Sequence, residues 1–379
     1  MRYEGVSSAQ GSLQTVMEFQ VRDKGRGQNK VTSAGYPLFS LPLLCPNHDP
    51  HYEMYALAAF LLSYVLPLLA VPTCIYLLCY AFSNLYMSLL GPQNLKKRYQ
   101  AEWALVTGAG TGIGKSLAET LAGQGLNLVL VSLPDKFLDE TVEQLKKSFP
   151  SQEFRKVAAK FDHKTDYMPS IIEATKDIHI SVLFNNAGYI VTGFFDKSNL
   201  DAQLANLECN ATACVKLTHH FLQRMILAKR RGCIVFTSSV AGFIPSPFTV
   251  MYGATKAFVS QFAASLAAEV RSLGIDVLAV HPSPVNSNFY DKVDAISMLE
   301  AAKSGAATPG SIPALMLACI GRSHVADMGS LALTVRACIA MLPYDTLASL
   351  FSAGAHLLPD YQKFNSLRGV TPDPVKKAN

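Results

Sequence analysis

The sequence predicts an α/β protein in which a doubly wound parallel sheet carries helices on both faces and follows a transmembrane segment. Between residues 103 and about 300, short apolar runs alternate with helical patterns, which is typical of βαβ units and a parallel sheet. Before them, residues 54–95 carry no charged side chain, and about 20 apolar residues suffice to span a bilayer. The chain is 50% hydrophobic and only 16% charged, which is more apolar than an ordinary soluble domain.

The N-terminal part divides into a tail and an apolar segment. Residues 1–53 show no sustained period and are expected to be a poorly ordered tail without the features of a signal peptide. Residues 54–95 are expected to cross the membrane as one tilted span, or as a hairpin bent at Pro67 and Pro72. The basic run Lys96-Lys97-Arg98 follows directly, so the positive-inside rule places the rest of the chain in the cytosol.

Six strands are predicted in the domain expected at 96–300, each an apolar run bounded by turn residues. They are WALVT (103–107), NLVLVS (127–132), KVAAKF (156–161), SVLFN (181–185), GCIVFTS (232–238) and IDVLAVH (275–281). Helical patterns lie between them, including 115–125, 137–149, 209–229 and 251–273.

A helical extension and tail are expected at 301–379. Apolar helices are predicted at 312–320 and 328–342, with a short helix at 298–302. The segment 328–342 fits either a core helix or a helix lying on the membrane surface.

Composition excludes two classes of function. The eight cysteines form no Cys-x-x-Cys pair and no Cys/His cluster with zinc spacing, so no metal site is predicted and buried thiols in a reducing compartment are expected. The net charge is only +5, and no lysine- and arginine-rich tract carries interleaved aromatic residues. Nucleic acid is therefore not an expected partner.

A glycine-rich turn joins the first strand to the next helix. It reads Thr107-Gly108-Ala109-Gly110-Thr111-Gly112-Ile113-Gly114. In this context Gly108 permits a tight turn, Gly112 lets the backbone approach a pyrophosphate, and Gly114 lets helix and strand pack closely. The helix N-terminus would face the phosphates. The turn therefore predicts a Rossmann-type dinucleotide site.

The end of the second strand normally selects between NAD and NADP, through an acidic residue or an arginine. Here Ser132-Leu133-Pro134 offers neither. Asp135 lies slightly late for the ribose, and Lys115 and Lys136 are near enough to help a phosphate. The choice is open on chemistry alone.

The stretch from Ser238 to Lys256 carries candidate catalytic side chains. Tyr252 and Lys256 are four residues apart, so on a helix they share one face. A fixed cation beside a phenol lowers its pKa and makes it a usable proton donor near neutral pH. Ser239 lies upstream across an apolar loop and is placed to bind the same substrate oxygen. Taken alone, Tyr-x-x-x-Lys also occurs as an ordinary surface pair, so the other motifs decide.

Together the motifs resemble those of the short-chain dehydrogenases/reductases, over about residues 103–290. In family order they are the glycine-rich turn, Asp162, Asn185-Asn186-Ala187-Gly188, Asn210, Ser239 and Tyr252-x-x-x-Lys256. The resemblance implies that Tyr252 is the general acid and that Ser239 hydrogen-bonds the carbonyl oxygen. It implies that Lys256 binds the nicotinamide ribose and lowers the pKa of the tyrosine, and that Asn210 holds a water in the proton relay. Ser239 is preferred to Ser238 because its spacing to Tyr252 is that of the family.

The resemblance also implies the cofactor-binding residues. They are Gly108, Thr111, Gly112, Ile113, Gly114, Ser132, Asp162, Asn186, Ala187, Gly188, Tyr252, Lys256, Pro282, Val285 and Ser287. The sequence departs from the family at Ser283, where a glycine usually follows the proline, and at Ser287, where threonine is usual. A residue with a Cβ lacks the conformational freedom of glycine, so the loop at Ser283 is expected to differ. NADPH is the expected cofactor.

A narrower resemblance joins the membrane segment to the chemistry. The narrower resemblance is to the very-long-chain 3-oxoacyl-CoA reductases and the related 17β-hydroxysteroid dehydrogenases. It is carried by the anchor, the basic run after it, the stretches 103–125 and 230–277, and the ending Lys376-Lys377-Ala378-Asn379. The two lysines fit a dilysine retrieval signal of endoplasmic-reticulum membrane proteins.

The resemblance implies a reductase of a lipid ketone on that membrane, facing the cytosol. The expected substrate is a 3-oxoacyl-CoA, and the alternative is a steroid or another hydrophobic ketone. A homodimer or partners in an elongation complex are possible assemblies. A non-catalytic dinucleotide- or lipid-binding scaffold is the alternative of another class.

Overall fold

The computed structural model describes residues 50–290, 296–297, 300 and 306–366. The chain forms two units, divided between Cys74 and Ile75. The described part of the first unit is helical: α1 (Pro50–Phe60), the π-helical turn η1 (Leu61–Val65) and the beginning of α2 (Leu66–Leu89). Helix α2 continues through Pro72, so the hairpin alternative is not observed. The π-turn lies directly before Pro67, where it accommodates a residue that cannot donate a backbone hydrogen bond.

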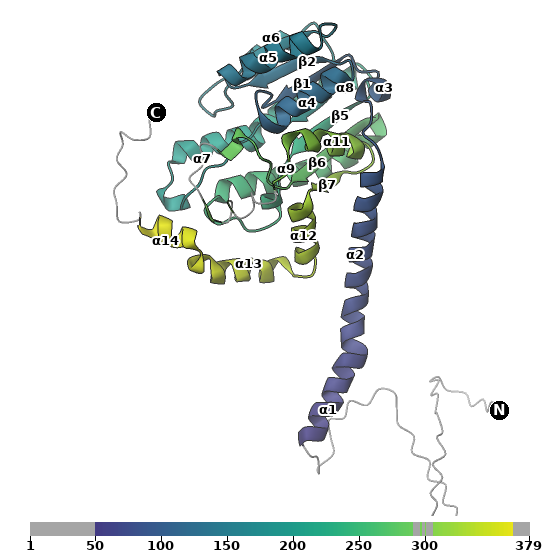
Figure 1. The fold of residues 1–379 in the computed structure, drawn as a ribbon, viewed down its shortest axis with the longest axis vertical. Coiled ribbons are helices and arrows are strands. Elements are labelled where there is room, and N and C mark those ends of the chain that lie inside the picture. Colours follow the sequence, from purple (N-terminus) through teal and green to yellow (C-terminus); the bar gives the residue numbers. More distant parts are fainter. Residues whose placement is uncertain (1–49, 291–295, 298–299, 301–305, 367–379) are drawn as a thin grey trace, which may run out of the picture. The chain divides into compact units, whose positions relative to one another are not determined.

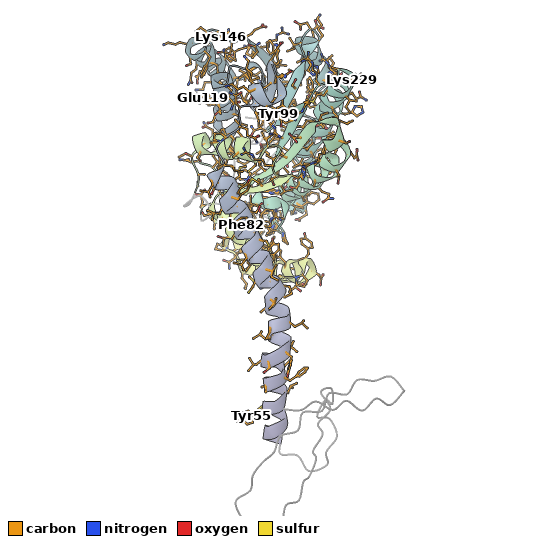
Figure 2. The ribbon with its side chains drawn as sticks, turned by 90° about the vertical axis from the view of Figure 1, so that its right-hand side faces the viewer. Tyr55, Phe82, Tyr99, Glu119, Lys146 and Lys229 are labelled. Atoms are coloured by element: carbon orange, nitrogen blue, oxygen red, sulfur yellow. The ribbon has the colours of Figure 1, made fainter. Side chains whose placement is uncertain are left out.

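One helix is long and apolar enough to cross a membrane. It runs over Leu57–Leu89, has 33 residues and a mean hydropathy of 2.0, and its apolar window is not buried. Tyr55 and Phe82 project from the helix, whereas Tyr99 lies inside the domain that follows (Figure 2). A bent pair, Ser330–Ile339 and Tyr344–Leu357, passes the same test only if both helices are counted as one span.

Seven parallel strands form one sheet among the described residues of the second unit, in the order β3-β2-β1-β4-β5-β6-β7 (Figure 1). The predicted fold class is confirmed. The strands are β1 (Trp103–Thr107), β2 (Asn127–Ser132), β3 (Phe154–Ala158), β4 (Ile180–Asn185), β5 (Gly232–Thr237), β6 (Ile275–Pro282) and β7 (Val325–Met328).

Two strands differ from the prediction. β3 begins two residues earlier than expected, because Phe154 pairs with Leu128 at the start of β2 and the register continues to Ser132 and Ala158. β7 was not predicted. It pairs with β6 from Ala279 onward, so the sheet takes a strand from the segment expected to be a helical extension.

Helices cover both faces of the sheet. They are α3 (Leu95–Tyr99), α4 (Gly112–Gly123), α5 (Lys136–Ser148), α6 (Met168–Thr175), α7 (Leu200–Leu207), α8 (Ala213–Leu227), α9 (Val250–Val270), α11 (Ile312–Cys319), α12 (Ser330–Ile339), α13 (Tyr344–Gly354) and α14 (Pro359–Ser366). The predicted helix 312–320 is confirmed, and that at 328–342 forms from Ser330 after β7. The short helix expected at 298–302 and the dilysine ending lie mostly or wholly outside the described residues.

The core has two layers, one on each side of the sheet. In β1, Ala104 and Val106 face the layer built with α4, α5 and α11, whereas Trp103 and Leu105 face the layer built with α6, α8 and α9. This alternation follows from the two-residue period of a strand. Both faces are buried, which explains why the strands read as continuous apolar runs.

The strand order reverses at β1, which lies between β2 and β4. In open α/β sheets, ligands bind outside the carboxyl ends of the strands at this switch point. The glycine-rich turn follows β1, and Asn186 follows β4. The fold therefore brings the two motifs to the expected crevice.

Candidate active site

The glycine-rich turn requires its glycines. Gly108 and Gly112 have φ of +64° and +56°, a region that favours residues without a Cβ. A Cβ on Gly114 would lie 2.0 Å from the carbonyl oxygen of Gly108, so α4 packs directly on the turn. Thr111 is the N-cap of α4, and its side chain makes no capping hydrogen bond.

The segment after β4 closes on this turn. The backbone N–H groups of Asn186 and Ala187 donate to Thr107 Oγ1 at 2.9 and 3.0 Å, and Asn186 Nδ2 donates to the carbonyl oxygen of Thr107 at 3.1 Å. A Cβ on Gly108 would lie 2.9 Å from Ala187 Cα. The two motifs are thus one structural unit.

The segment after β6 reaches the same turn. A Cβ on Gly112 would meet Ser287 Cβ at 3.2 Å, and Val285 forms an isolated bridge with Ala307. On the β2 side, Ser132 Oγ would lie 3.3 Å from a Cβ on Gly110. These predicted cofactor residues therefore gather around the N-terminus of α4.

The acidic candidates near the adenine end have other partners. Asp162 pairs with Lys160 Nζ at 2.9 Å and accepts the backbone N–H of Lys164 at 3.0 Å. The hydrogen bond from Lys160, followed by that from Lys164, lowers the pKa of Asp162. Asp135 caps α5 by accepting the N–H of Leu138 at 3.1 Å, so the end of β2 presents neither an acid nor an arginine.

Helix α9 begins at Val250 and places the tyrosine and lysine on successive turns. Both side chains are buried, with Tyr252 8% and Lys256 3% exposed. Lys256 Nζ lies 5.6 Å from the centroid of the Tyr252 ring and donates to the carbonyl oxygen of Thr237 at 2.8 Å. The predicted pair is therefore brought together at the end of β5.

The two serines at the end of β5 have different surroundings. Ser239 is the N-cap of the 3₁₀ turn η4 (Val240–Gly242), and it hydrogen-bonds Tyr252. Ser238 is buried, and its hydroxyl donates to the carbonyl oxygen of Lys256 at 2.7 Å. The geometry fits Ser239 as the residue that meets the substrate and gives Ser238 a structural contact.

Burial controls the protonation of the pair. Burial raises the pKa of Tyr252, and the hydrogen bond from Ser239 acts in the opposite direction. Burial lowers the pKa of Lys256, because here too it disfavours the charged form of the side chain. Lys256 is not among the causes of the shift in the Tyr252 pKa; its ammonium donates to the Thr237 carbonyl oxygen and lies 5.6 Å from the centroid of the tyrosine ring.

Asn210 lies in the π-helical turn η3 (Glu208–Thr212), which joins α7 to α8. Extra residues of this kind within helices often mark functional sites. Asn210 Oδ1 accepts the N–H of Tyr189 at 3.0 Å, and Asn210 Nδ2 donates to the Tyr189 carbonyl oxygen at 3.0 Å and to Thr255 Oγ1 at 3.2 Å. The amide is thereby fixed in orientation; its predicted role of holding a water stays a prediction.

Gly188 keeps the centre of the site open. A Cβ on Gly188 would lie 3.2 Å from both Asn210 Oδ1 and Lys256 Nζ. Any other residue would fill the space beside the lysine ammonium. Together with the bare N-terminus of α4, this cradle fits a nicotinamide dinucleotide.

No functional role was predicted for Ser283, His281 or Asp327. Ser283 does not have a positive φ, since Gln100, Lys229 and Phe248 are the non-glycine residues with one in the described part of the chain. Its Oγ instead accepts the N–H of Ala332 at 3.0 Å and thus caps α12. His281 and Asp327 form a buried pair, with Nδ1 and Oδ1 2.9 Å apart; neither was predicted, because β7 was not.

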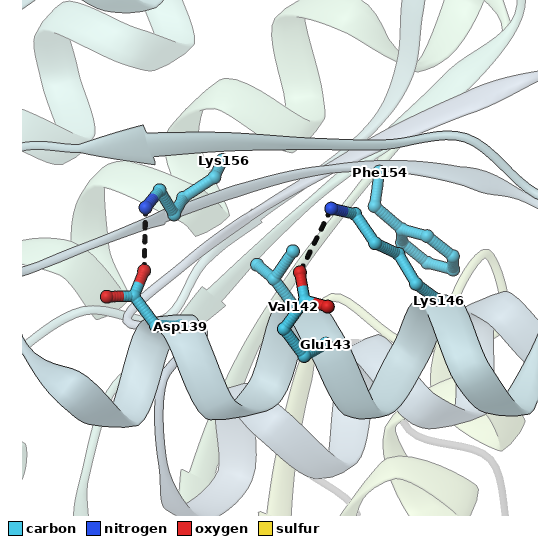
Figure 3. A pocket seen from close by; sticks show the side chains of 6 residues that line it. All are labelled: Asp139, Val142, Glu143, Lys146, Phe154 and Lys156. Carbon is cyan, nitrogen blue, oxygen red and sulfur yellow. Dashed lines mark hydrogen bonds and ion pairs between the residues drawn. The ribbon is translucent and has the colours of Figure 1, made fainter.

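A separate depression of about 420 Å³ lies on α5 and β3. Its charges are already paired, Asp139 with Lys156 at 2.6 Å and Glu143 with Lys146 at 3.1 Å (Figure 3). No candidate site residue lines it. Within the described residues no group of three His, Cys, Asp or Glu side chains is arranged to hold a metal.

Comparisons with known proteins agree with this geometry. The sequence model of the family described as short chain dehydrogenase matches residues 102–296. The chain is 32% identical over 227 residues to very-long-chain 3-oxoacyl-CoA reductase-A of Danio rerio, covering 58% of this chain and 70% of that one. It is 35% identical over 193 residues to 17-beta-hydroxysteroid dehydrogenase type 3 of Rattus norvegicus, covering 50% and 62%. The chain thus spans roughly two thirds of the length of these relatives.

Solved structures show the same fold. A short-chain dehydrogenase from Sphingobium yanoikuyae in complex with NADPH superposes with a TM-score of 0.55 at 25% identity. The match covers 72% of this chain and 98% of that chain.

Proposed function

This chain belongs to the short-chain dehydrogenase family and is therefore an oxidoreductase of alcohol and ketone groups, and from this premise we propose that it is a membrane-anchored, NADPH-dependent reductase of a lipid ketone. The proposed substrate class is a 3-oxoacyl-CoA. The observation that carries the proposal is the buried pair of Tyr252 and Lys256, with Ser239 interacting with the tyrosine, beside the open cradle at Gly188.

The residues divide the work of ketone reduction. The bound nicotinamide cofactor would supply the hydride. Tyr252, kept protonated by burial, would donate its proton to the carbonyl oxygen as negative charge develops there. Ser239 would hydrogen-bond the same oxygen and fix its position. Lys256, held by the Thr237 carbonyl, would bind the nicotinamide ribose and bring positive charge to the site.

Apolar side chains near the catalytic residues support a lipid ketone as the substrate. The loop between Ser239 and Tyr252 is apolar, and its Phe248 belongs to a buried cluster with Ile296 and Phe364. The Phe289 ring lies 6.2 Å from that of Tyr252. The named relatives favour a 3-oxoacyl-CoA or, as the second candidate, a 17-ketosteroid. A non-catalytic scaffold would more naturally carry a broken catalytic set, whereas this set is complete.

The apolar helix supports the proposal of a membrane anchor, because its length matches the thickness of a bilayer. Tyr80 OH donates to Asp327 Oδ2 at 2.8 Å, and the N–H of Gln93 donates to the Leu317 carbonyl oxygen at 3.3 Å. Tyr80 and Gln93 thus contact the catalytic domain. Residues 57–79 remain for the bilayer, about 34 Å of helix, which matches a hydrocarbon core of about 30 Å.

The compartment and assembly are proposed from sequence. The basic run at 96–98 argues for a cytosolic catalytic domain. Homodimer formation and elongation partners are proposed only as assemblies to test.

The test is NADPH oxidation by detergent-solubilised protein offered a long-chain 3-oxoacyl-CoA and a 17-ketosteroid side by side, with NADH in parallel. Turnover of the acyl-CoA with NADPH is the expected result. Turnover of the steroid alone would keep the residue roles and change the substrate. Cofactor binding without turnover of either ketone would argue against this substrate assignment and favour the scaffold.

A further inference from the structure

A buried polar cluster lies at the carboxyl ends of β6 and β7. Asp327 Oδ1 accepts a hydrogen bond from His281 Nδ1 at 2.9 Å, and Asp327 Oδ2 accepts one from Arg336 Nε at 3.0 Å. The Tyr80 hydroxyl also donates to Oδ2, at 2.8 Å. The His281 and Asp327 side chains are only 2% and 5% exposed. Such burial is costly unless every charge is paired, and here the carboxylate is paired on both oxygens.

One arm of the cluster reaches the helix that carries the catalytic lysine. His281 Nε2 lies 2.8 Å from Ser260 Oγ, which lies 2.7 Å from Ser238 Oγ. The Ser238 hydroxyl donates to the carbonyl oxygen of Lys256 at 2.7 Å. Contacts at hydrogen-bond distance therefore lead from β6 to the backbone of Lys256, and Ser260 Oγ itself lies 2.8 Å from the Lys256 carbonyl oxygen.

A second arm reaches the turn that carries the catalytic serine. The guanidinium of Arg336 lies 3.7 Å from the centroid of the Phe243 ring, and the His281 ring meets the same ring edge-on at 5.3 Å. Phe243 is the C-cap of η4, the turn whose N-cap is Ser239. The same cluster thus supports both catalytic segments.

The chemistry of the partners fixes the tautomer of His281. A carboxylate can only accept, so Nδ1 donates to Asp327 and leaves Nε2 as an acceptor for the Ser260 hydroxyl. Burial lowers the pKa of His281, Asp327 opposes this, and the positive charges of Arg336 and Lys256 support it. A neutral imidazole leaves the Ser238 hydroxyl to donate to Lys256, as observed.

We propose that His281, oriented by Asp327 and Arg336, is a positioning residue that fixes Lys256 and the Ser239 turn relative to Tyr252. This inference rests on the proposed reductase function, because it assigns His281 a role in that reaction. His281 acts through Ser260 and Phe243 and does not itself touch the reacting atoms.

The experiment uses the full chain in detergent and four variants. His281→Phe keeps a ring against Phe243 but removes both hydrogen bonds, and His281→Gln restores an acceptor for Ser260. Ser260→Ala breaks the chain with a smaller change, in case His281→Phe fails to fold. Ser265→Ala is the matched control, an exposed serine on the same helix. The measurements are the Kd for NADPH from nicotinamide fluorescence, kcat against pH, and Tm.

We expect His281→Phe and Ser260→Ala to lower kcat about tenfold and to raise the Kd for NADPH about fivefold, since a small misplacement of a reacting group is costly. The high-pH limb of kcat should shift, because the lysine no longer sits in its place beside the tyrosine. His281→Gln should recover part of both losses, and Ser265→Ala should match the wild type.

A lower Tm with wild-type Kd, kcat and pH profile per folded molecule would assign the cluster to stability alone and overturn the proposal. If the wild type itself reduced neither ketone, the proposed function would fail, and the NADPH affinities of the same variants would still decide the positioning role. Equal affinities for NADPH would then overturn it.

Discussion

Replacing Gly242 with alanine tests how tightly the serine turn is set against the lysine helix. A Cβ at this position would lie 2.8 Å from the carbonyl carbon of Lys256 and 2.9 Å from its oxygen. Both are backbone atoms, and ordinary contact begins near 3.4 Å. The turn therefore has to move away from α9 by about 0.6 Å, because a closely packed interior leaves no room for the added methyl group.

The magnitude follows from that displacement. Overpacking of this kind costs about 1–3 kcal/mol of stability. A misplacement of about 1 Å at a reacting centre can cost about 100-fold in rate, so a shift of about 0.6 Å predicts a loss of about tenfold or more in kcat/KM. The Ser239 hydroxyl moves with the turn, so the loss should appear in kcat more than in the affinity for NADPH.

The assay compares NADPH oxidation and thermal unfolding for the Gly242→Ala protein and the wild type. Gly354→Ala is the control, because a Cβ on Gly354 would meet nothing within 4 Å. The control should keep wild-type activity. If Gly242→Ala also kept wild-type kcat/KM and Tm, the close packing of η4 on α9 would not be what holds Ser239 in place.

Three further predictions concern other parts of the chain. Gly114→Ala should abolish measurable NADPH binding in a fluorescence titration, because its Cβ would lie 2.0 Å from the Gly108 carbonyl oxygen; wild-type affinity would contradict the packing of α4 on the turn. Burial raises the pKa of Asp327, but hydrogen bonds from His281 and Arg336 lower it to about 2 overall from 3.8. The resulting stabilisation of about 2 kcal/mol is complete above about pH 4 and lost as the pH falls toward 2. Urea unfolding should therefore show a steeper acid loss for the wild type than for Asp327→Asn, and equal slopes would refute the assignment. Removal of residues 1–79 should release the protein from membranes washed with alkaline carbonate, whereas a truncated protein still in the pellet would point to a second membrane contact.

Much of the fold was predictable because both faces of the sheet are buried. β1, β2 and β4 appear in the sequence as apolar runs, and the structure places them within one residue of the prediction. β7 was not predictable in this way, because it has only four residues and one is the charged Asp327. Its place in the sheet depends on pairing with β6, and such long-range pairing leaves no local period.

The candidate site was likewise predictable only in part. The glycine turn and the pair Tyr252–Lys256 follow from local rules of spacing, and the structure brings them together. The direction of the Tyr252 pKa did not follow, because burial raises it more than the interaction with Ser239 lowers it. The pair of His281 and Asp327 is equally invisible in sequence, since the two residues meet only when β6 and β7 align.

The most direct test of the account is the turnover of a long-chain 3-oxoacyl-CoA with NADPH by the wild type and by Tyr252→Phe. The phenol is the proposed proton donor, and phenylalanine keeps the ring while removing the proton. We predict that Tyr252→Phe still binds NADPH but loses at least about 100-fold in kcat, the lower range of a general-acid contribution. Turnover by Tyr252→Phe at the wild-type rate would contradict the proposed mechanism.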